Sequence, residues 1–307
     1  MKILIAGAGG YVGKNFINFF YDEGCYEIFT IARKKIESKK IKYQYIGDIN
    51  KVDIFNGKKY FFDIVINLMA DTRHFGNKKN FYNDNVSSLK SLLKCLDGYY
   101  NYFFHVSTEA VFLSGKLKIL THQSSLPRRL LSDYAWSKNI AEKLFMNFKN
   151  SRGIKVILRP RLIWGGRQST VNYKINSALT KNQFFYVDGG RYKTSVCHIR
   201  NLYLSIFQAI KYADNDDVFF VVDKDPVTFS NFVKINTSKK NLKKKIINLP
   251  RSFVYLACLV SDLLRKITFN KLSTPLSLSL YYLTLSSVII DDKHTREKLK
   301  FNPKNYM

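Results

Sequence analysis

The sequence predicts an α/β fold, in which helices cover a parallel β-sheet and a smaller lobe follows toward the C-terminus. Short, mostly apolar, β-branched runs alternate with amphipathic stretches from residue 1 to about residue 165, which is the pattern of such a sheet. Apolar residues make up 46% of the 307 residues and aromatic residues 15%. This composition supplies the side chains for a sizeable core and excludes a disordered chain.

Six strands are expected in the first part, each mostly apolar because a parallel sheet is buried on both faces. They comprise residues 2–6, 27–32, 43–46, 63–68, 102–107 and 155–159. Amphipathic spacing predicts helices between them, with residues 85–96 and 134–148 as the clearest and residues 14–21 directly after the first strand.

The alternation loosens after residue 165, which divides the chain into two expected parts, residues 1–165 and 166–307. Because no long linker rich in Gly, Ser or Pro separates them, we expect the two parts to share an interface and to interleave. The second part is expected to hold a helix at 201–212, a strand at 218–222, apolar helices at 253–264 and 276–290, and, after a strand, a short helix at 293–299. Both apolar stretches fall short of a membrane span, so we expect them to pack on the domain as amphipathic helices.

The chain is strongly basic, with 50 Lys and Arg against 23 Asp and Glu and a formal net charge of +27. Such a charge attracts phosphates, nucleic acid or anionic membranes, and by itself it does not choose among them. The simplest interpretation is a solvated, lysine-rich exterior, because the basic residues run through the whole chain. The one dense cluster comprises Lys239, Lys240 and residues 243–245. A nucleic-acid partner is not expected, since the sequence shows no recognised binding module.

The four cysteines, Cys25, Cys95, Cys197 and Cys258, lie far apart and never at metal-ligand spacing. They predict a reducing compartment and no metal site. Since the sequence turns into glycines before any signal-peptide core, a cytoplasmic location is expected. Peripheral contact with the inner face of a membrane, suggested by the basic surface, and a homodimer stay open alternatives.

A glycine-rich turn connects the first predicted strand to the first predicted helix, with Gly7, Gly10 and Gly13 in GxxGxxG spacing. Such a turn lets the backbone approach a pyrophosphate, whose charge then lies against the N–H groups and the positive dipole of the helix start. Glycines also form ordinary turns, but the strand before and the helix after this turn predict dinucleotide binding.

The residue after the second strand indicates which dinucleotide is bound, because a carboxylate there accepts the ribose 2′-hydroxyl and a cation accommodates a 2′-phosphate. Arg33 follows this strand, and the first acid is Glu37. NADP is therefore favoured over NAD, with a plain surface charge as the alternative interpretation of Arg33. Asp48, after the third strand, is expected to place a carboxylate near the adenine amine.

Tyr134 and Lys138 are spaced i and i+4, on one face of a predicted helix. A tyrosine at its ordinary pKa of about 10 is a poor base at neutral pH, and a neighbouring ammonium is expected to lower that pKa. Tyr134 could then exchange a proton with a substrate hydroxyl or carbonyl while a hydride passes to or from a nicotinamide. Thr108 ends the fifth strand, at the sheet edge where ligands bind, and is the candidate donor that orients the substrate oxygen.

In these motifs the chain resembles the extended short-chain dehydrogenase/reductase family, which includes the NAD-dependent epimerases and dehydratases, over essentially its full length. The resemblance rests on the three glycines, Asp48, Asn67-Leu68-Met69-Ala70 after the fourth strand, Ser107-Thr108 after the fifth, and Tyr134 with Lys138. It implies a Rossmann-type, doubly wound sheet, with residues 1–165 as the NAD(P)-binding domain and residues 166–307 as the substrate-binding lobe.

The resemblance also implies roles for single residues. Tyr134 would act as acid and base, Lys138 would hold the nicotinamide ribose, and Thr108 would polarise the oxygen of a small-molecule substrate. The implied cofactor-binding residues are Gly7, Gly10, Tyr11, Val12, Gly13, Arg33, Asp48, Ile49, Leu68, Met69, Ala70, Lys138 and Pro160.

Later segments, at 158–165, 189–201 and 291–293, look most like the branch with 3β-hydroxysteroid dehydrogenase-like and sterol-decarboxylating enzymes. Leu162 stands where nucleotide-sugar epimerases carry an Asn that helps bind the diphosphate. Glu109-Ala110 stands where 4,6-dehydratases carry Asp-Glu, and Phe112-Leu113 replaces a Tyr-Gly pair. These departures favour an oxidoreductase acting on a secondary alcohol or ketone less polar than a nucleotide sugar.

Two other functions stay open. A nucleotide-sugar epimerase or reductase of surface polysaccharide biosynthesis could bind a diphosphate through Arg161, Arg167 and Arg191. A cofactor-sensing protein that does no chemistry is the other, although the intact Thr108, Tyr134 and Lys138 argue against it.

Two further residues have expected roles. Asn85 is expected either to cap its helix or to serve the site, because a recurrent Asn of the family matches it. His198, alone at a helix start, is expected to be structural.

Overall fold

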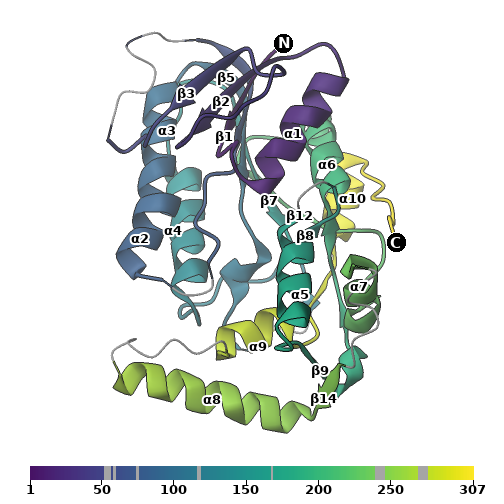
Figure 1. The fold of residues 1–307 in the computed structure, drawn as a ribbon. Coiled ribbons are helices and arrows are strands. Elements are labelled where there is room, and N and C mark those ends of the chain that lie inside the picture. Colours follow the sequence, from purple (N-terminus) through teal and green to yellow (C-terminus); the bar gives the residue numbers. More distant parts are fainter. Residues whose placement is uncertain are drawn as a thin grey trace.

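The computed structural model describes residues 1–51, 57, 60–73, 76–115, 119–166, 169–238, 246–268 and 276–307 (Figure 1). Arg167 and the predicted lysine cluster at 239–245 lie outside these described residues. Within the described ranges, no helix is long and apolar enough to cross a membrane.

A seven-stranded parallel sheet lies at the centre, in the strand order β12-β7-β5-β4-β1-β2-β3. Its strands are β1 Lys2–Ala6, β2 Glu27–Ala32, β3 Tyr43–Ile46, β4 Phe62–Asn67, β5 Tyr100–Val106, β7 Ile154–Pro160 and β12 Asp217–Val221. The first three match their predicted ranges, and the other four begin one or two residues earlier than predicted. The strand order reverses between β1 and β4, and doubly wound sheets bind ligands at such a switch point. The predicted fold class is confirmed.

Helices cover both faces of the sheet, because alternate side chains of each strand enter different cores. Ile3 packs in a core with α1 and α6, whereas its neighbour Leu4 packs with α3 and α4. The bounds are α1 Tyr11–Asp22, α3 Ser88–Leu96, α4 Asp133–Asn147 and α6 Ile199–Tyr212. Figure 1 shows α1 and α6 on one side of the sheet and α3 and α4 on the other.

The predicted helix at 85–96 begins differently in the structure. A short helix, α2 (Lys78–Tyr82), leads into a π-helical turn, η1 (Asn83–Ser87), and only then into α3. The wide turn is supported by side chains, since the Asn83 carbonyl accepts hydrogen bonds from Ser88 Oγ (3.1 Å) and from Asn50 Nδ2 (3.3 Å). The predicted start of the helix at residue 85 was wrong, because apolar periodicity does not reveal the side-chain hydrogen bonds that support a π-helical turn.

Further helices, 3-10 turns and small two-stranded sheets complete the fold, mainly with residues after 165. The helices are α5 Thr170–Thr180, α7 Phe229–Asn236, α8 Arg251–Ile267, α9 Leu278–Thr284 and α10 Lys293–Leu299, with 3-10 turns η2 Glu109–Phe112 and η3 Asp188–Gly190. The strand pairs are β8 Ile163–Trp164 with β11 Cys197–His198, β9 Phe185–Val187 with β14 Ile247–Leu249, β10 Lys193–Thr194 with β13 Val227–Thr228, and β6 Ile119–Leu120 with β15 Ile289–Ile290. β12 extends the central sheet and α6 covers one of its faces, whereas the boundary at residue 165 and the interleaving of two parts stay predictions.

The predicted helix at 276–290 is shorter in the structure. α9 ends at Thr284, after which Ser286 Oγ bonds back to the Tyr282 carbonyl (2.8 Å) and Ser287 Oγ bonds to the Lys193 carbonyl (2.8 Å). The β-branched residues that follow form β15, which pairs with β6.

The other apolar stretch forms α8, but it faces the opposite way from the prediction. Its apolar side chains were expected to pack on the domain, whereas Phe253 and Leu256 are exposed and the buried stripe consists of Val254, Cys258 and Ser261. Periodicity identifies two faces of a helix and does not say which face meets the protein.

Candidate active site

The glycine turn after β1 has the close packing that its motif predicts. Gly7 has a φ of +84°, and a Cβ there would lie 2.7 Å from the backbone of Leu68. A Cβ on Gly13 would lie 2.6 Å from the Cα of Ala8, so both positions require glycine for the fold itself. At Gly10 the nearest atom to an added Cβ would be 3.5 Å away, so packing does not require glycine there.

A cavity of about 200 Å³ opens beside this turn, at the carboxyl ends of β1 to β4. The predicted cofactor-binding residues that line it are Gly7, Gly10, Arg33, Asp48, Ile49, Leu68, Met69 and Ala70. The other five lie outside this lining: Tyr11, Val12 and Gly13 begin α1, Lys138 lies in α4, and Pro160 ends β7. The lining residues that were not among the predicted ones are Ile31, Ala32, Gly47, Asp84 and Ser88, and the last two lie outside the strand ends on which the prediction rested.

Two features beside this cavity suit parts of a dinucleotide. Backbone at Gly10 is open to close approach, and the start of α1 follows it directly, which is the arrangement that holds a pyrophosphate. At the end of β3, Asp48 Oδ1 accepts a hydrogen bond from the backbone N–H of Asn50 (3.0 Å), which fixes the carboxylate beside the cavity. The roles predicted for these residues stay predictions.

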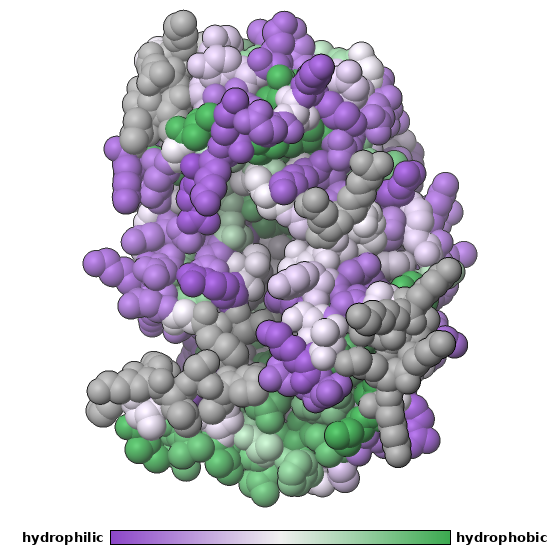
Figure 2. Space-filling view, viewed as in Figure 1, coloured by the Kyte–Doolittle hydropathy of each residue, from purple (hydrophilic) through white to green (hydrophobic). Residues whose placement is uncertain are grey.

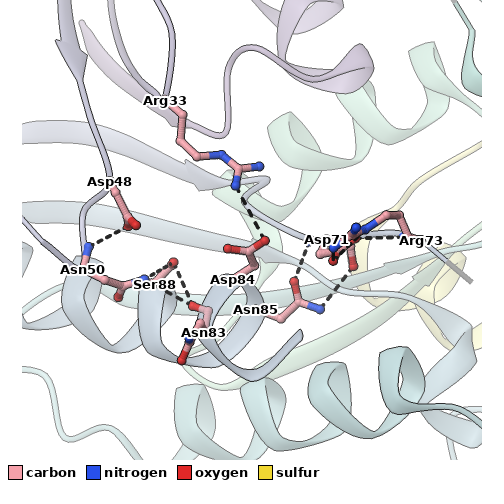
Figure 3. Close-up of polar contacts among 9 residues, drawn as sticks. All are labelled: Arg33, Asp48, Asn50, Asp71, Arg73, Asn83, Asp84, Asn85 and Ser88. Carbon is pink, nitrogen blue, oxygen red and sulfur yellow. Dashed lines mark hydrogen bonds and ion pairs between the residues drawn. The ribbon is translucent and has the colours of Figure 1, made fainter. Parts of the chain in front are cut away.

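Arg33 and Asp84 face each other at the edge of the cavity (Figure 3). Arg33 Nη1 lies 3.7 Å from Asp84 Oδ2, and the Arg33 side chain is 74% exposed. The guanidinium is therefore accessible to a phosphate, which would compete with Asp84 for it. Asp84 gives no signal in the sequence, because the π-helical turn that carries it was not predicted.

Asn85 neither caps a helix nor lines the cavity. It lies buried inside η1, where its Oδ1 accepts a hydrogen bond from the backbone N–H of Asp71 (2.6 Å) and its Nδ2 donates to Ser137 Oγ (2.8 Å). Asn85 thus connects the segment after β4 to α4. Asp71 is held further by Arg73: burial alone would raise the pKa of Asp71, but hydrogen bonds from Arg73 outweigh burial and lower it.

The structure brings the predicted catalytic residues together at the carboxyl end of β5. The Thr108 side chain lies close enough to the Tyr134 phenol to influence its pKa. Lys138 is 1% exposed; its Nζ donates to the Val106 carbonyl (2.9 Å) and lies 3.4 Å from His105 Nε2. His105 was missed from the sequence, and burial together with the Lys138 charge lowers its pKa well below the ordinary value, so its ring is neutral.

The predicted effect of Lys138 on Tyr134 is wrong. Burial raises the pKa of Tyr134, and the nearby Glu109 carboxylate raises it further, while the neighbouring Thr108 side chain offsets them only in part. Burial also lowers the pKa of Lys138 to about 8, against an opposing effect of Glu142. The i, i+4 spacing does not bring the two groups into contact because the Lys138 ammonium turns toward β5. Tyr134 is therefore a neutral phenol at pH 7.

Glu109 and Arg161 form an ion pair inside the protein. Glu109 Oε2 also accepts a hydrogen bond from Thr108 Oγ1 (2.8 Å). Arg161 Nη2 donates to Thr194 Oγ1 (3.0 Å) and to the Leu283 carbonyl (2.6 Å). The guanidinium is thus engaged by internal groups, which does not support the predicted diphosphate contact.

The other two cations proposed for a diphosphate give little support either. Arg191 is exposed, with its Nε donating to the Asp188 carbonyl (3.3 Å), and Arg167 lies outside the described residues. Leu162 has a φ of +42°, in the left-handed region that favours Asn and Gly. The chain therefore keeps a backbone shape suited to Asn while carrying Leu.

His198 is accounted for by contacts within the fold. It is the N-cap residue of α6, where its Nδ1 accepts a hydrogen bond from the backbone N–H of Arg200 (3.3 Å). Its ring stacks on Tyr306, with 3.9 Å between ring centroids.

A family model described as the NAD dependent epimerase/dehydratase family matches residues 3–221. The chain belongs to this family. The membership confirms the predicted family, and with it the prediction that the protein is an enzyme of the extended short-chain dehydrogenase/reductase type. Together with the parallel sheet, it also confirms the Rossmann-type fold.

Three curated relatives are similar to this chain over most of its length. A 4-hydroxy-2-methyl-3-oxo-4-farnesyl-3,4-dihydroquinoline-1-oxide ketoreductase of Stigmatella aurantiaca is 25% identical, over 97% of this chain and 91% of the relative. A decarboxylating sterol-4-alpha-carboxylate 3-dehydrogenase of Dictyostelium discoideum is 24% identical, over 99% and 97%. An N-acetyl-alpha-D-glucosaminyl-diphospho-ditrans,octacis-undecaprenol 4-epimerase of Escherichia coli O157:H7 is 25% identical, over 88% and 82%.

The fold of this family enzyme is also similar to solved structures. MoeE5 in complex with UDP-glucuronic acid and NAD superposes with a TM-score of 0.74 at 15% identity, covering 99% of this chain and 94% of that chain. The similarity shows a shared fold.

Proposed function

We propose that this protein is an NAD(P)-dependent oxidoreductase that interconverts a secondary alcohol and a ketone on an apolar substrate, as 3β-hydroxysteroid dehydrogenases do. The main support is the surrounding of Tyr134, which packs in an apolar cluster with Leu113, Leu283 and Tyr282. An apolar skeleton gains by leaving water for such a surrounding. The phosphates of a nucleotide sugar would need cations, and Arg161 is already engaged by Glu109.

The names of two relatives support the same substrate class. One relative is a ketoreductase whose substrate name contains a farnesyl group, and the other is a sterol 3-dehydrogenase. Both names combine a ketone or alcohol with an apolar carbon skeleton.

The residues around Tyr134 can each be given a role. Bound NAD(P) would supply or accept the hydride. Because its pKa is raised, Tyr134 is protonated at neutral pH and suits donation of a proton to a ketone oxygen. Lys138 provides a buried cation for the nicotinamide ribose. Thr108 donates its proton to Glu109 and would have to turn it toward the substrate oxygen in order to polarise that oxygen.

NADP is proposed as the preferred dinucleotide. Arg33 lines the cavity with an exposed guanidinium, which suits a 2′-phosphate, although its pairing with Asp84 weakens this preference. The solved relative MoeE5 contains NAD. A cytoplasmic location is proposed as well, and a homodimer stays an open alternative.

A second candidate function is epimerisation of a sugar carried on a nucleotide or a lipid diphosphate. The Escherichia coli relative, whose name specifies a diphospho-undecaprenol sugar, and the UDP-glucuronic acid bound to MoeE5 favour it. A cofactor-sensing protein is disfavoured because the Thr108 side chain lies beside the Tyr134 phenol, an arrangement that a sensor does not need.

The experiment is a hydride-transfer assay with purified protein, NADPH or NADH, and a panel of sterol and terpenoid ketones. We expect turnover by the wild type and a loss of about 10² to 10⁴-fold in Tyr134→Phe, since that variant lacks the transferable proton. Equal rates in the two proteins would contradict the proposal. A parallel titration with UDP separates the functions, because tight UDP binding without ketone turnover would favour the epimerase.

A further inference from the structure

The outward side of α8 is apolar over its whole length. Six of its side chains, each 40–63% exposed, form what we call the outer face of α8: Phe253, Leu256, Val260, Leu263, Leu264 and Ile267. Their spacing of three, four and seven residues places them on one side of a helix. Figure 2 shows hydrophobic colour gathered at the end of the molecule where Figure 1 places α8.

The inward side of α8 carries the polar groups. Ser261 Oγ donates to the Leu276 carbonyl (2.6 Å), and Asp262 Oδ2 accepts from the backbone N–H of Leu278 (2.9 Å). Arg265 pairs with Asp262, with 3.3 Å between Nη1 and Oδ1. A helix at a boundary between protein and water has the reverse arrangement. The outer face of α8 is therefore suited to an apolar medium.

The charge of the chain determines which apolar medium fits. Within residues 246–268, Asp262 is the only acid, and it faces inward, whereas Lys266 lies near the C-terminal end of the helix. Arg251, at its start, pairs with Asp188, with 2.9 Å between Nε and Oδ2. The whole chain carries +27. Two copies with this charge repel each other, whereas anionic lipid headgroups attract it.

We propose that the outer face of α8 docks on an anionic lipid bilayer, with the helix axis lying in the plane of the membrane. The 17 residues of α8 extend about 25 Å at the rise of an α-helix. An interfacial helix of this kind immerses its apolar face at the level of the headgroups and acyl chains and keeps its cations among the headgroups.

Docking in this way would bring the bilayer close to Tyr134. Tyr281 of α9 packs with Val254 and Cys258 of α8, while Leu283, two residues further along α9, packs in the cluster that contains Tyr134. A single helix therefore lies between the docking surface and the predicted proton donor.

The test is flotation of the full-length protein with liposomes, without cofactor or substrate, so its outcome does not depend on the reaction proposed above. Phosphatidylcholine vesicles are compared with vesicles of phosphatidylcholine and phosphatidylglycerol in a 7:3 ratio, that is, with about a third anionic lipid. We expect binding to the anionic vesicles that weakens as salt is added.

The double variant Leu256→Glu/Leu263→Glu should lower binding at least about tenfold, because it places two charges in the immersed face. Ile235→Glu, at an exposed aliphatic position on α7, is the matched control and should bind like the wild type.

A second readout places α8 in the bilayer. Leu256→Trp should show a blue-shifted emission that brominated lipid quenches, beyond the signal of Trp136 and Trp164 in the wild type. Absence of wild-type binding to the anionic vesicles at low salt would overturn the proposal. Equal binding to neutral vesicles would overturn its anionic part. A wild-type dimer that the double variant converts to a monomer, without vesicle binding by either, would assign the face to a second copy of the chain instead.

Discussion

Glu109 and Arg161 form a buried ion pair, with side chains 5% and 1% exposed, that joins Thr108 to α9. Thr108 donates to one oxygen of Glu109, and Arg161 binds the other oxygen and holds the Leu283 carbonyl at the end of α9. The pair thus couples Thr108, which is predicted to orient the substrate, with α9, the helix that covers Tyr134.

Glu109→Gln should lower the pKa of Tyr134, because the Glu109 charge is one of the causes that raise it. In the enzyme assay, the alkaline limb of kcat/KM against pH should move to lower pH. The free energy of unfolding of this variant should also be lower by about 3 to 5 kcal/mol, since the Arg161 charge is left buried without its partner. Glu109→Asp keeps the charge and is the control. An unmoved limb in Glu109→Gln would show that the carboxylate does not act on Tyr134.

Gly10→Ala and Gly13→Ala should separate cofactor binding from folding. A Cβ at Gly13 would lie 2.6 Å from Ala8, so this variant should lose several kcal/mol of stability, about 1 to 3 or more. Gly10→Ala meets no such clash, so its free energy of unfolding should lie within about 1 kcal/mol of the wild-type value. Its affinity for NAD(P)H, measured by fluorescence titration, should nevertheless fall about tenfold or more. Unchanged affinity in Gly10→Ala would place the pyrophosphate elsewhere.

Arg33→Ala should discriminate between the two dinucleotides. If the guanidinium binds a 2′-phosphate, the KM for NADPH should rise about tenfold or more, while the KM for NADH changes little. Asp84→Asn should act in the opposite direction and lower the KM for NADPH, because it removes the carboxylate that pairs with Arg33. An equal effect of Arg33→Ala on both cofactors would leave Arg33 as a surface charge.

Lys138 should make stability depend on pH in a defined window. Its pKa is about 8 in the folded protein and 10.5 in the unfolded chain, so between these values the unfolded chain binds more protons and stability rises with pH. The free energy of unfolding of the wild type minus that of Lys138→Met should therefore increase between pH 8 and 10.5, by up to about 1.4 kcal/mol per pH unit. Urea titrations at several pH values measure it. A constant difference would mean that the ammonium is not destabilised by burial.

The local parts of the site were predictable from the sequence. Gly7, Asp48 and Met69 each lie within two residues of the end of a strand, and carboxyl ends of neighbouring parallel strands meet at one edge of a sheet. Thr108 was predicted beside Tyr134 because it follows β5 at the same edge, and in the structure its side chain lies close enough to the phenol to influence the pKa of Tyr134.

The long-range parts were not predictable from one sequence. Arg161 was a candidate diphosphate contact only in the alternative epimerase function. Its partner Glu109 lies 52 residues away, and spacing alone does not pair two charges at that separation. Asp84 joins the cavity through a π-helical turn that leaves no periodic signature. The direction of α8 was also missed, because the decisive contacts of Ser261 and Asp262 are with the segment before α9.

The position of β12 in the sheet has a consequence for synthesis on the ribosome. β12 pairs with β7, so the pairing edge of β7 stays uncovered until residue 221 has left the exit tunnel. A nascent chain released after residue 165 would display this apolar edge strand and lack the α6 cover of one sheet face. Such fragments should aggregate, which makes the late strand a checkpoint for cotranslational folding.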